Sequence, residues 1–171
     1  MKDIKSDIKE WIQAILIAVV LSMVIRIFLF ETTLVYGSSM SPTLHHKDRV
    51  IINKIVYHLD QPSRGDIVVF KNPDNNKENY VKRIIGIAGD TIEIIDGELY
   101  VNDELLNEDY IDEPTQGDFT KIETPEGTIF VLGDNRNHSQ DSRIVGSVPV
   151  ENMIGKAQLR IWPLSDITFF R

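Results

Sequence analysis

The stretch Gly37-Ser38-Ser39-Met40-Ser41-Pro42-Thr43-Leu44 separates a long apolar segment before it from a body rich in β-branched residues after it. A cluster of small residues that is closed by a proline is typical of a turn. Turns held on a rigid scaffold often carry reactive side chains, so Ser39 is the candidate nucleophile. A serine hydroxyl needs a base to activate it, and the turn itself supplies none.

Lys82 is the candidate base. It interrupts the apolar run Tyr80-Val81-Lys82-Arg83-Ile84-Ile85-Gly86, and lysine is rarely fully buried unless it is paired. An ordinary amine with a pKa of about 10.4 is protonated at pH 7 and cannot accept a proton. Desolvation favours the neutral amine and can bring its pKa down to about 7, so a lysine in apolar surroundings can activate Ser39.

The four histidines offer an alternative base. His45 and His46 lie in a polar turn, and His58 lies at the end of a predicted strand. His138 lies within the polar segment that follows Gly133 and keeps a Ser/His pairing open. A histidine base predicts half-maximal activity near pH 6.5. A lysine of lowered pKa predicts activity that rises with pH and reaches half its maximum at about pH 7 or above.

Composition limits the remaining possibilities. The chain has 171 residues, which suggests one domain with appendages. The absence of cysteine excludes disulfides, thiolate catalysis and cysteine-based zinc sites, and no histidine has the HExxH spacing of a metalloprotease. A net charge of −8 argues against nucleic-acid binding, which needs a basic surface. We therefore expect no metal, no cofactor and no nucleic-acid partner.

Residues 11–30, WIQAILIAVVLSMVIRIFLF, form the apolar segment. About 20 helical residues span roughly 30 Å, which is the thickness of the hydrocarbon core of a bilayer. Three lysines precede the segment, and the next basic residue after it is Lys47. The positive-inside rule then predicts a cytoplasmic segment of residues 1–10, a transmembrane anchor of residues 11–30 and an extracytoplasmic domain of residues 31–171.

Two other interpretations of this segment are open. It could be a secretory signal peptide that is cleaved after Val35-Tyr36-Gly37, although it is long for one and ends in the bulky run Phe28-Leu29-Phe30. It could also be a buried helix of a soluble protein, although its length argues against this.

The body is predicted to be mainly β, an antiparallel sheet or barrel-like domain. Short β-branched runs are separated by Gly and Pro turns, and Asp96-Gly97 is the strongest hairpin signal in the chain. Residues 102–124 are polar and acidic and are predicted to form a loop. The predicted strands are residues 49–57, 66–70, 80–87, 91–95, 98–101, 128–132 and 154–162.

Four segments, in this order behind an apolar N-terminal segment, resemble the type I signal peptidases, and the similarity runs from about residue 11 to the C-terminus. They are Ser39-Met40-Ser41-Pro42-Thr43, Arg64-Gly65-Asp66-Ile67-Val68-Val69-Phe70, Tyr80-Val81-Lys82-Arg83 and Gly133-Asp134-Asn135-Arg136-Asn137-His138-Ser139-Gln140-Asp141-Ser142-Arg143.

The resemblance implies a membrane-anchored serine endopeptidase with a Ser39/Lys82 dyad. It would remove N-terminal signal peptides from exported preproteins after small residues, close to the export machinery and the membrane lipid. Ser139 matches a serine that hydrogen-bonds the lysine in this family. The remaining matched positions are assigned to charge pairing and support of the site: Asp141, Arg143, Arg83 and Asp134. From the residues alone, Asp134-Asn135-Arg136 could equally be a polar turn cap.

The oxyanion site and the substrate pocket are also inferred by resemblance. The backbone N–H of Ser39 is the first donor. Gram-negative members have a serine at the position of Gly37, so the second donor here is open, and Ser38 is a candidate. An extended substrate would pair with residues 31–37 and 79–81. The predicted pocket walls are Val35, Tyr36, Met40, Leu44, Tyr80 and Val81, although Leu44 and Val81 could instead be core residues.

The same resemblance implies that the catalytic face lies toward the membrane. Aromatic and apolar residues near both ends of the body could contact lipid, although Trp162 could also be an ordinary core residue. These residues are Phe28, Phe30, Ile161, Trp162, Phe169 and Phe170.

Two rival functions are weighed against a signal peptidase. A self-cleaving Ser/Lys regulator of the SOS-repressor type would lack a membrane span and usually carries a DNA-binding module. An anchored β-domain that only binds a partner would keep its function when Lys82 is replaced by Ala.

Overall fold

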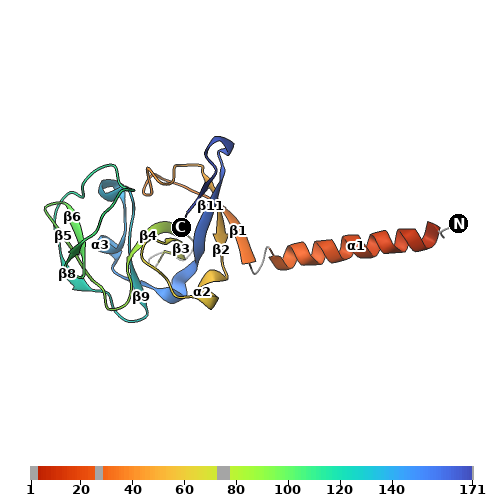
Figure 1. Cartoon of the computed structure of the whole chain (residues 1–171), viewed down its shortest axis with the longest axis horizontal. Coiled ribbons are helices and arrows are strands. Elements are labelled where there is room, and N and C mark those ends of the chain that lie inside the picture. Colours follow the sequence, from red (N-terminus) through yellow and green to blue (C-terminus); the bar gives the residue numbers. More distant parts are fainter. Residues whose placement is uncertain (1–3, 26–28, 73–77, 171) are drawn as a thin grey trace.

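The computed structural model describes residues 4–25, 29–72 and 78–170. Helix α1 (Ile4–Val24) projects from the β-rich body along the long axis of the molecule (Figure 1). Within these ranges, no helix combines the length and the apolar character needed to cross a membrane. The transmembrane prediction for residues 11–30 is therefore not confirmed, and residues 26–28 of that range, with Phe28, lie outside the described residues.

A large antiparallel sheet, which is curled, forms most of the body and confirms the prediction of a mainly β fold. Its strand Arg49–Asn53 alternates the buried residues Val50 and Ile52 with more exposed ones, whereas Ile67–Lys71 is buried at four consecutive positions. In spatial order they are β1 (Phe30–Leu34), β2 (Arg49–Asn53), β11 (Met153–Trp162), β3 (Ile67–Lys71), β4 (Asn79–Gly86), β9 (Thr128–Leu132) and β10 (Val148–Pro149), and β12 (Thr168–Phe169) pairs with β11.

A second sheet of four strands, here called the small sheet, lies at the end of the body away from α1 (Figure 1). The apolar side chains Ile92 and Leu99 of the small sheet pack with Phe130 and Leu132 of β9, so one core joins the two sheets. Its strands are β7 (Glu104–Leu105), β6 (Glu98–Val101), β5 (Thr91–Ile95) and β8 (Phe119–Glu123).

Two predicted boundaries are wrong. The strand predicted over residues 49–57 ends at Asn53, because its side-chain oxygen accepts the N–H groups of Ile55 and Val56 and turns the chain. The predicted loop of residues 102–124 contains β7 and β8. The short helices complete the fold: α2 (Val56–Leu59), η2 (Arg136–His138), α3 (Ser142–Val145), η3 (Val150–Asn152) and η4 (Leu164–Asp166).

Two strand edges are left unpaired next to each other, which matters for the site. β1 pairs only with β2 in the described structure. β4 pairs with β3 from Asn79 onward, but its pairing with β9 begins only at Arg83. Residues 79–82 therefore have backbone groups on one side that no neighbouring strand uses.

The C-terminal aromatic residues differ in their surroundings. Trp162 is 50% exposed and Phe169 is 75% exposed, so the alternative that Trp162 is a core residue is wrong. Phe170, in contrast, packs against the core cluster that contains Val50 and Ile67.

Candidate active site

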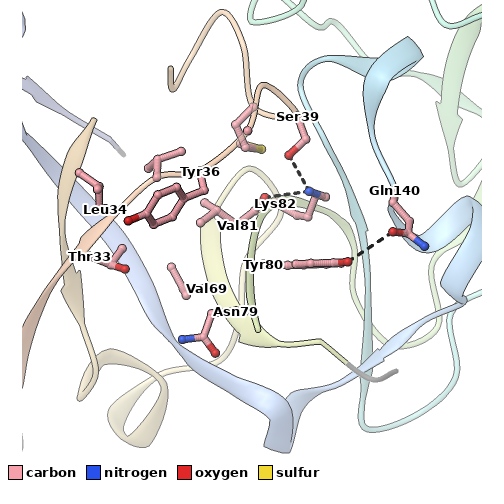
Figure 2. Close-up of a pocket in the computed structure, with 13 residues that line it drawn as sticks. Thr33, Leu34, Tyr36, Ser39, Val69, Asn79, Tyr80, Val81, Lys82 and Gln140 are labelled. Atoms are coloured by element: carbon pink, nitrogen blue, oxygen red, sulfur yellow. Dashed lines mark hydrogen bonds between the residues drawn. The ribbon is translucent and has the colours of Figure 1, made fainter. Parts of the chain in front are cut away.

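Lys82 and Ser39 meet at one end of a cleft (Figure 2). Lys82 Nζ donates a hydrogen bond to Ser39 Oγ at 2.7 Å and another to the carbonyl oxygen of Val81 at 3.2 Å. Lys82 is only 4% exposed. Burial lowers the pKa of Lys82 to about 8, against the opposing effect of the carboxylates of Asp141 and Asp134. At pH 7 about one tenth of the amine is therefore neutral, far more than for an ordinary lysine with a pKa of about 10.4.

Two buried apolar side chains fix the turn that carries Ser39 to the core. Met40 is 2% exposed and Leu44 is 0% exposed, and both belong to the core cluster with Val35 and Val50. The N–H of Leu44 donates to the carbonyl of Met40 at 2.8 Å, which closes the turn. Leu44 is thus a core residue and does not line the cleft, contrary to its predicted role as a pocket wall.

The cleft has a cavity volume of about 210 Å³. Tyr36 and Gln140 lie on opposite sides of it, with Tyr80 and Lys82 between them (Figure 2). Five of the predicted pocket residues line it, namely Val35, Tyr36, Met40, Tyr80 and Val81. The other lining residues are Thr33, Leu34, Gly37, Ser39, Val69, Asn79, Lys82 and Gln140. Val69 and Gln140 lie in two of the family-like segments but were not predicted to line the cleft.

The three candidate oxyanion donors differ in their hydrogen bonds and in whether they line the cleft. No hydrogen bond within the described ranges uses the backbone N–H of Ser39. Gly37 lines the cleft with a φ of 89°, and its N–H donates to Nδ1 of His46 at 3.3 Å. Ser38 is exposed and does not line the cleft, and its carbonyl accepts from Nδ2 of Asn135 at 3.2 Å.

Ser139 does not hydrogen-bond Lys82, in contrast to the expectation from the family. Its Oγ is buried and has no hydrogen-bond partner among the described residues. The amine of Lys82 is instead engaged by Ser39 and Val81. Ser139 Oγ lies next to Gly133, where an added Cβ would also overlap the carbonyl oxygen of Ser39.

An ion pair between Asp141 and Arg143 supports the segment that contains Ser139. Arg143 donates to Asp141 from Nε at 2.8 Å and from Nη2 at 2.9 Å. Asp141 also accepts the backbone N–H of Gly133 at 3.1 Å. One carboxylate therefore closes the loop between the end of β9 and the start of α3.

A second buried pair connects three parts of the site. Arg83 on β4 donates to Asp134 from Nε at 2.9 Å and from Nη2 at 2.7 Å, and Asp134 also accepts the hydroxyl of Thr43. The side chain of Asp134 is 0% exposed. This carboxylate thus ties the turn of Ser39 to β4, which carries Lys82.

No histidine has a hydrogen bond to the nucleophile in the described structure. None of them lines the cleft or hydrogen-bonds Ser39, and His45, His46, His58 and His138 are all exposed. His138 Nδ1 faces Oδ1 of Asn135 at 3.2 Å. The Ser/His alternative therefore has no geometric support. In the described part of the chain, no three potential ligands among His, Asp and Glu gather to form a metal site.

Comparisons with known proteins identify the family of this chain. Residues 8–162 match the family described as signal peptidase, peptidase S26. The chain is 41% identical to signal peptidase I of Bacillus licheniformis over 95% of its length and 93% of that protein. It is 42% identical to signal peptidase I P of Bacillus subtilis subsp. natto, with 95% and 94% coverage.

A solved structure gives the same result. The crystal structure of a signal peptidase I from Enterococcus faecalis V583 superposes with a TM-score of 0.53 and 36% sequence identity. The match covers 58% of this chain and 98% of that one. This chain therefore belongs to the signal peptidase family, peptidase S26, and is a hydrolase of the serine peptidase class.

Proposed function

We propose that this protein cleaves N-terminal signal peptides from exported preproteins, with Ser39 as the nucleophile and Lys82 as the general base. The observation that carries the proposal is the 2.7 Å contact between a buried amine and a hydroxyl at the end of a partly apolar cleft. This is the nucleophile–base geometry that acyl transfer requires.

The reaction proceeds in two halves. Neutral Lys82 takes the proton of Ser39 while Oγ attacks the scissile carbonyl carbon, and the backbone N–H of Ser39 donates to the resulting oxyanion. The protonated amine gives its proton to the leaving nitrogen, the C–N bond breaks, and an acyl-enzyme remains. Lys82 then deprotonates a water that attacks the ester, and it returns the proton to Ser39 as the C–O bond breaks.

The unpaired edges of β1 and β4 support binding of the substrate as an extended strand. In an extended chain, alternate side chains point to the same side. The first and third side chains before the cut would then enter the cleft together, where Val35, Met40 and Val81 form apolar walls. Such walls select small residues by steric exclusion.

Anchoring in the cell membrane as a single span, with the N-terminus in the cytoplasm, is part of the proposal. The apolar side chains of α1 are widely exposed, for example Trp11 at 72%, Leu16 at 62% and Met23 at 60%. Exposed apolar surface on this scale is typical of a contact with lipid or another protein. A catalytic body held there would act on preproteins as they leave the export machinery.

The proposal is tested by incubating a purified preprotein in detergent with the wild type, Ser39→Ala and Lys82→Ala. We expect cleavage at one site by the wild type alone, with circular dichroism showing that all three proteins are folded. A folded Lys82→Ala variant that cuts at the normal rate would exclude the mechanism. A self-cleaving regulator would instead cut its own chain without any preprotein.

The pH dependence of cleavage distinguishes the two candidate bases. Because the reaction needs the neutral amine and the pKa of Lys82 is lowered to about 8, kcat/KM should rise with pH and reach half its maximum near pH 8. At pH 6 it should be about a hundredfold below the plateau. A histidine base would place the half-maximum near pH 6.5.

Asp141→Asn provides a second test of the assignment of this pH profile to Lys82. The carboxylate of Asp141 raises the pKa of Lys82, so its neutralisation should lower that pKa and move the half-maximum to a lower pH. A shift in the opposite direction would contradict the assignment of the limb to Lys82.

Gly133→Ala should reduce kcat by about 10²-fold or more, because displacement of a catalytic group by about 1 Å can cost that much. The added Cβ would overlap the carbonyl oxygen of Ser39, which cannot move without moving Ser39. Gly86→Ala is the matched control, since its Cβ would meet the side chains of Ile92 and Thr124 instead. Both variants are compared by kcat and by thermal unfolding, and equal losses of kcat would contradict the prediction.

A further inference from the structure

Glu108 and Tyr110 lie in the connection between β7 and β8, far from the catalytic residues in sequence. We infer that these two residues are positioning residues for the catalytic centre, through which the small sheet holds Arg136 and Arg83 in place. The inference rests on the proposed function and adds two residues to it that lie outside the four family-like segments.

Glu108 is the partner of Arg136. Arg136 Nη1 donates to Oε2 of Glu108 at 2.7 Å, and Nη2 donates to Oε1. The side chains of Arg136 and Glu108 are 0% and 7% exposed. A planar pair of two parallel hydrogen bonds fixes the direction of both groups, and burial prevents water from replacing either partner.

Tyr110 contributes a ring and a hydroxyl. The centroid of its ring lies 4.0 Å from Cζ of Arg83, the residue that follows Lys82, and 6.0 Å from Cζ of Arg136. Its hydroxyl donates to Oε1 of Glu108 at 2.7 Å. The ring thus packs on the guanidinium of Arg83, lies at the outer limit of a cation–π contact with that of Arg136, and is itself held by the carboxylate that binds Arg136.

Hydrogen bonds continue from these pairs to the nucleophile. Arg136 Nε donates to the carbonyl of Gly133 at 3.0 Å, which fixes the backbone on either side of Asn135. Asn135 in turn donates its N–H to the carbonyl oxygen of Ser39 at 3.0 Å. The orientation of the Ser39 peptide group therefore depends on where Arg136 is held.

Each of three guanidinium groups around this segment is paired with a carboxylate of its own, and Glu108 is the partner of Arg136. Three guanidinium groups, those of Arg83, Arg136 and Arg143, face three carboxylates, those of Asp134, Asp141 and Glu108. Without Glu108, Asp134 is the other carboxylate that acts on Arg136, and it is already the partner of Arg83. Removal of Glu108 would therefore make the two arginines compete for one carboxylate.

The chain contains a matched control pair. Tyr100 on β6 of the small sheet donates its hydroxyl to Glu98 at 3.0 Å, with the same spacing of two residues as Tyr110 and Glu108. Neither residue of this control pair has a hydrogen bond or ion pair to the Gly133–Arg143 segment in the described structure.

The test compares Glu108→Gln and Tyr110→Leu with Glu98→Gln and Tyr100→Leu, using purified full-length protein and a preprotein in detergent. We expect kcat to fall at least about tenfold for the first two variants, with KM within about twofold, because β1 and β4 still form the cleft. The two control variants should keep kcat within about twofold. Tyr110→Phe keeps the ring and should retain most of kcat.

Amide hydrogen exchange gives a second readout that needs no substrate. Exchange of the Asn135 N–H should accelerate at least about tenfold in Glu108→Gln and not in Glu98→Gln. Unchanged kcat, a loss of kcat that only follows the unfolded fraction, or a rise in KM alone would each overturn the inference.

The two proposals fail in distinguishable ways. A wild type with Ser39-dependent cleavage, together with Glu108 and Tyr110 variants that behave like their controls, would overturn the positioning role and leave the proposed function intact. A wild type without Ser39-dependent cleavage would overturn the proposed function, and the exchange of the Asn135 amide would then decide the positioning role alone.

Discussion

Lys82→Met is expected to lower kcat/KM for preprotein cleavage by at least about 10⁴-fold while the protein remains folded. A general base alone contributes about 10²–10⁴-fold, and loss of one member of a catalytic pair also disables its partner. Methionine is unbranched and fills a similar apolar space. Lys82 is only 4% exposed, so the substitution also removes an amine whose charged form is disfavoured by burial. Single-turnover cleavage measures the loss, and thermal unfolding measures the stability.

Lys71→Met is the matched control for this variant. Lys71 lies at the end of β3, the strand that pairs with β4, and its side chain is exposed. We expect its kcat/KM to stay within about twofold of the wild type, as is usual for surface substitutions. A folded Lys82→Met protein that retains more than about 1% of the wild-type rate would contradict the assignment of Lys82 as the base.

Asp134→Ala is expected to lower the free energy of unfolding by about 3–5 kcal/mol. The substitution leaves the guanidinium of Arg83, whose side chain is 10% exposed, without its carboxylate. It also frees the hydroxyl of Thr43, which donates to Asp134. Urea unfolding followed by circular dichroism measures this change, and the midpoint should fall without a change in slope.

Glu31→Ala tests whether burial is the cause. Glu31 pairs with Lys54 at 3.0 Å, but its side chain is 48% exposed, so its removal should cost no more than about 1 kcal/mol. The double variant Arg83→Met/Asp134→Leu removes both charges and should recover much of the stability that Asp134→Ala loses. Equal losses for Asp134→Ala and Glu31→Ala would contradict the prediction.

Sequence patterns predicted the elements whose conformation depends mainly on neighbouring residues. The hairpin around Asp96-Gly97 has its strands where the turn residues predict them, since two residues with positive φ set the register. Strand β8 escaped prediction because only Phe119 and Ile122 of its five residues are apolar and half-buried, which gives no clear period of two. Its pairing with β5 depends on contacts that are distant in sequence.

The candidate site was predictable to a similar extent. Ser39 could be selected because it lies in a turn of small residues, and Lys82 because a lysine is unusual in an apolar run. Their 2.7 Å contact depends on a turn and a strand that only the fold brings together. Gln140 and Val69 reach the cleft from other elements, and nothing in the sequence around them indicates that they would line it. Leu44 was predicted to line the pocket but is a core residue. An apolar residue close to a nucleophile in sequence has the same pattern in either role.

The two unpaired strand edges at the cleft have a consequence for timing. A strand can be added between β1 and β4 only from a polypeptide whose own backbone groups are still free, because a folded region has already used them. Once the region around the scissile bond has acquired secondary structure, it can no longer enter. Under the proposed binding of the substrate as a strand, maturation of a secreted protein has to be completed while that region is still unfolded, and the folding rate of the secreted protein limits how long cleavage remains possible.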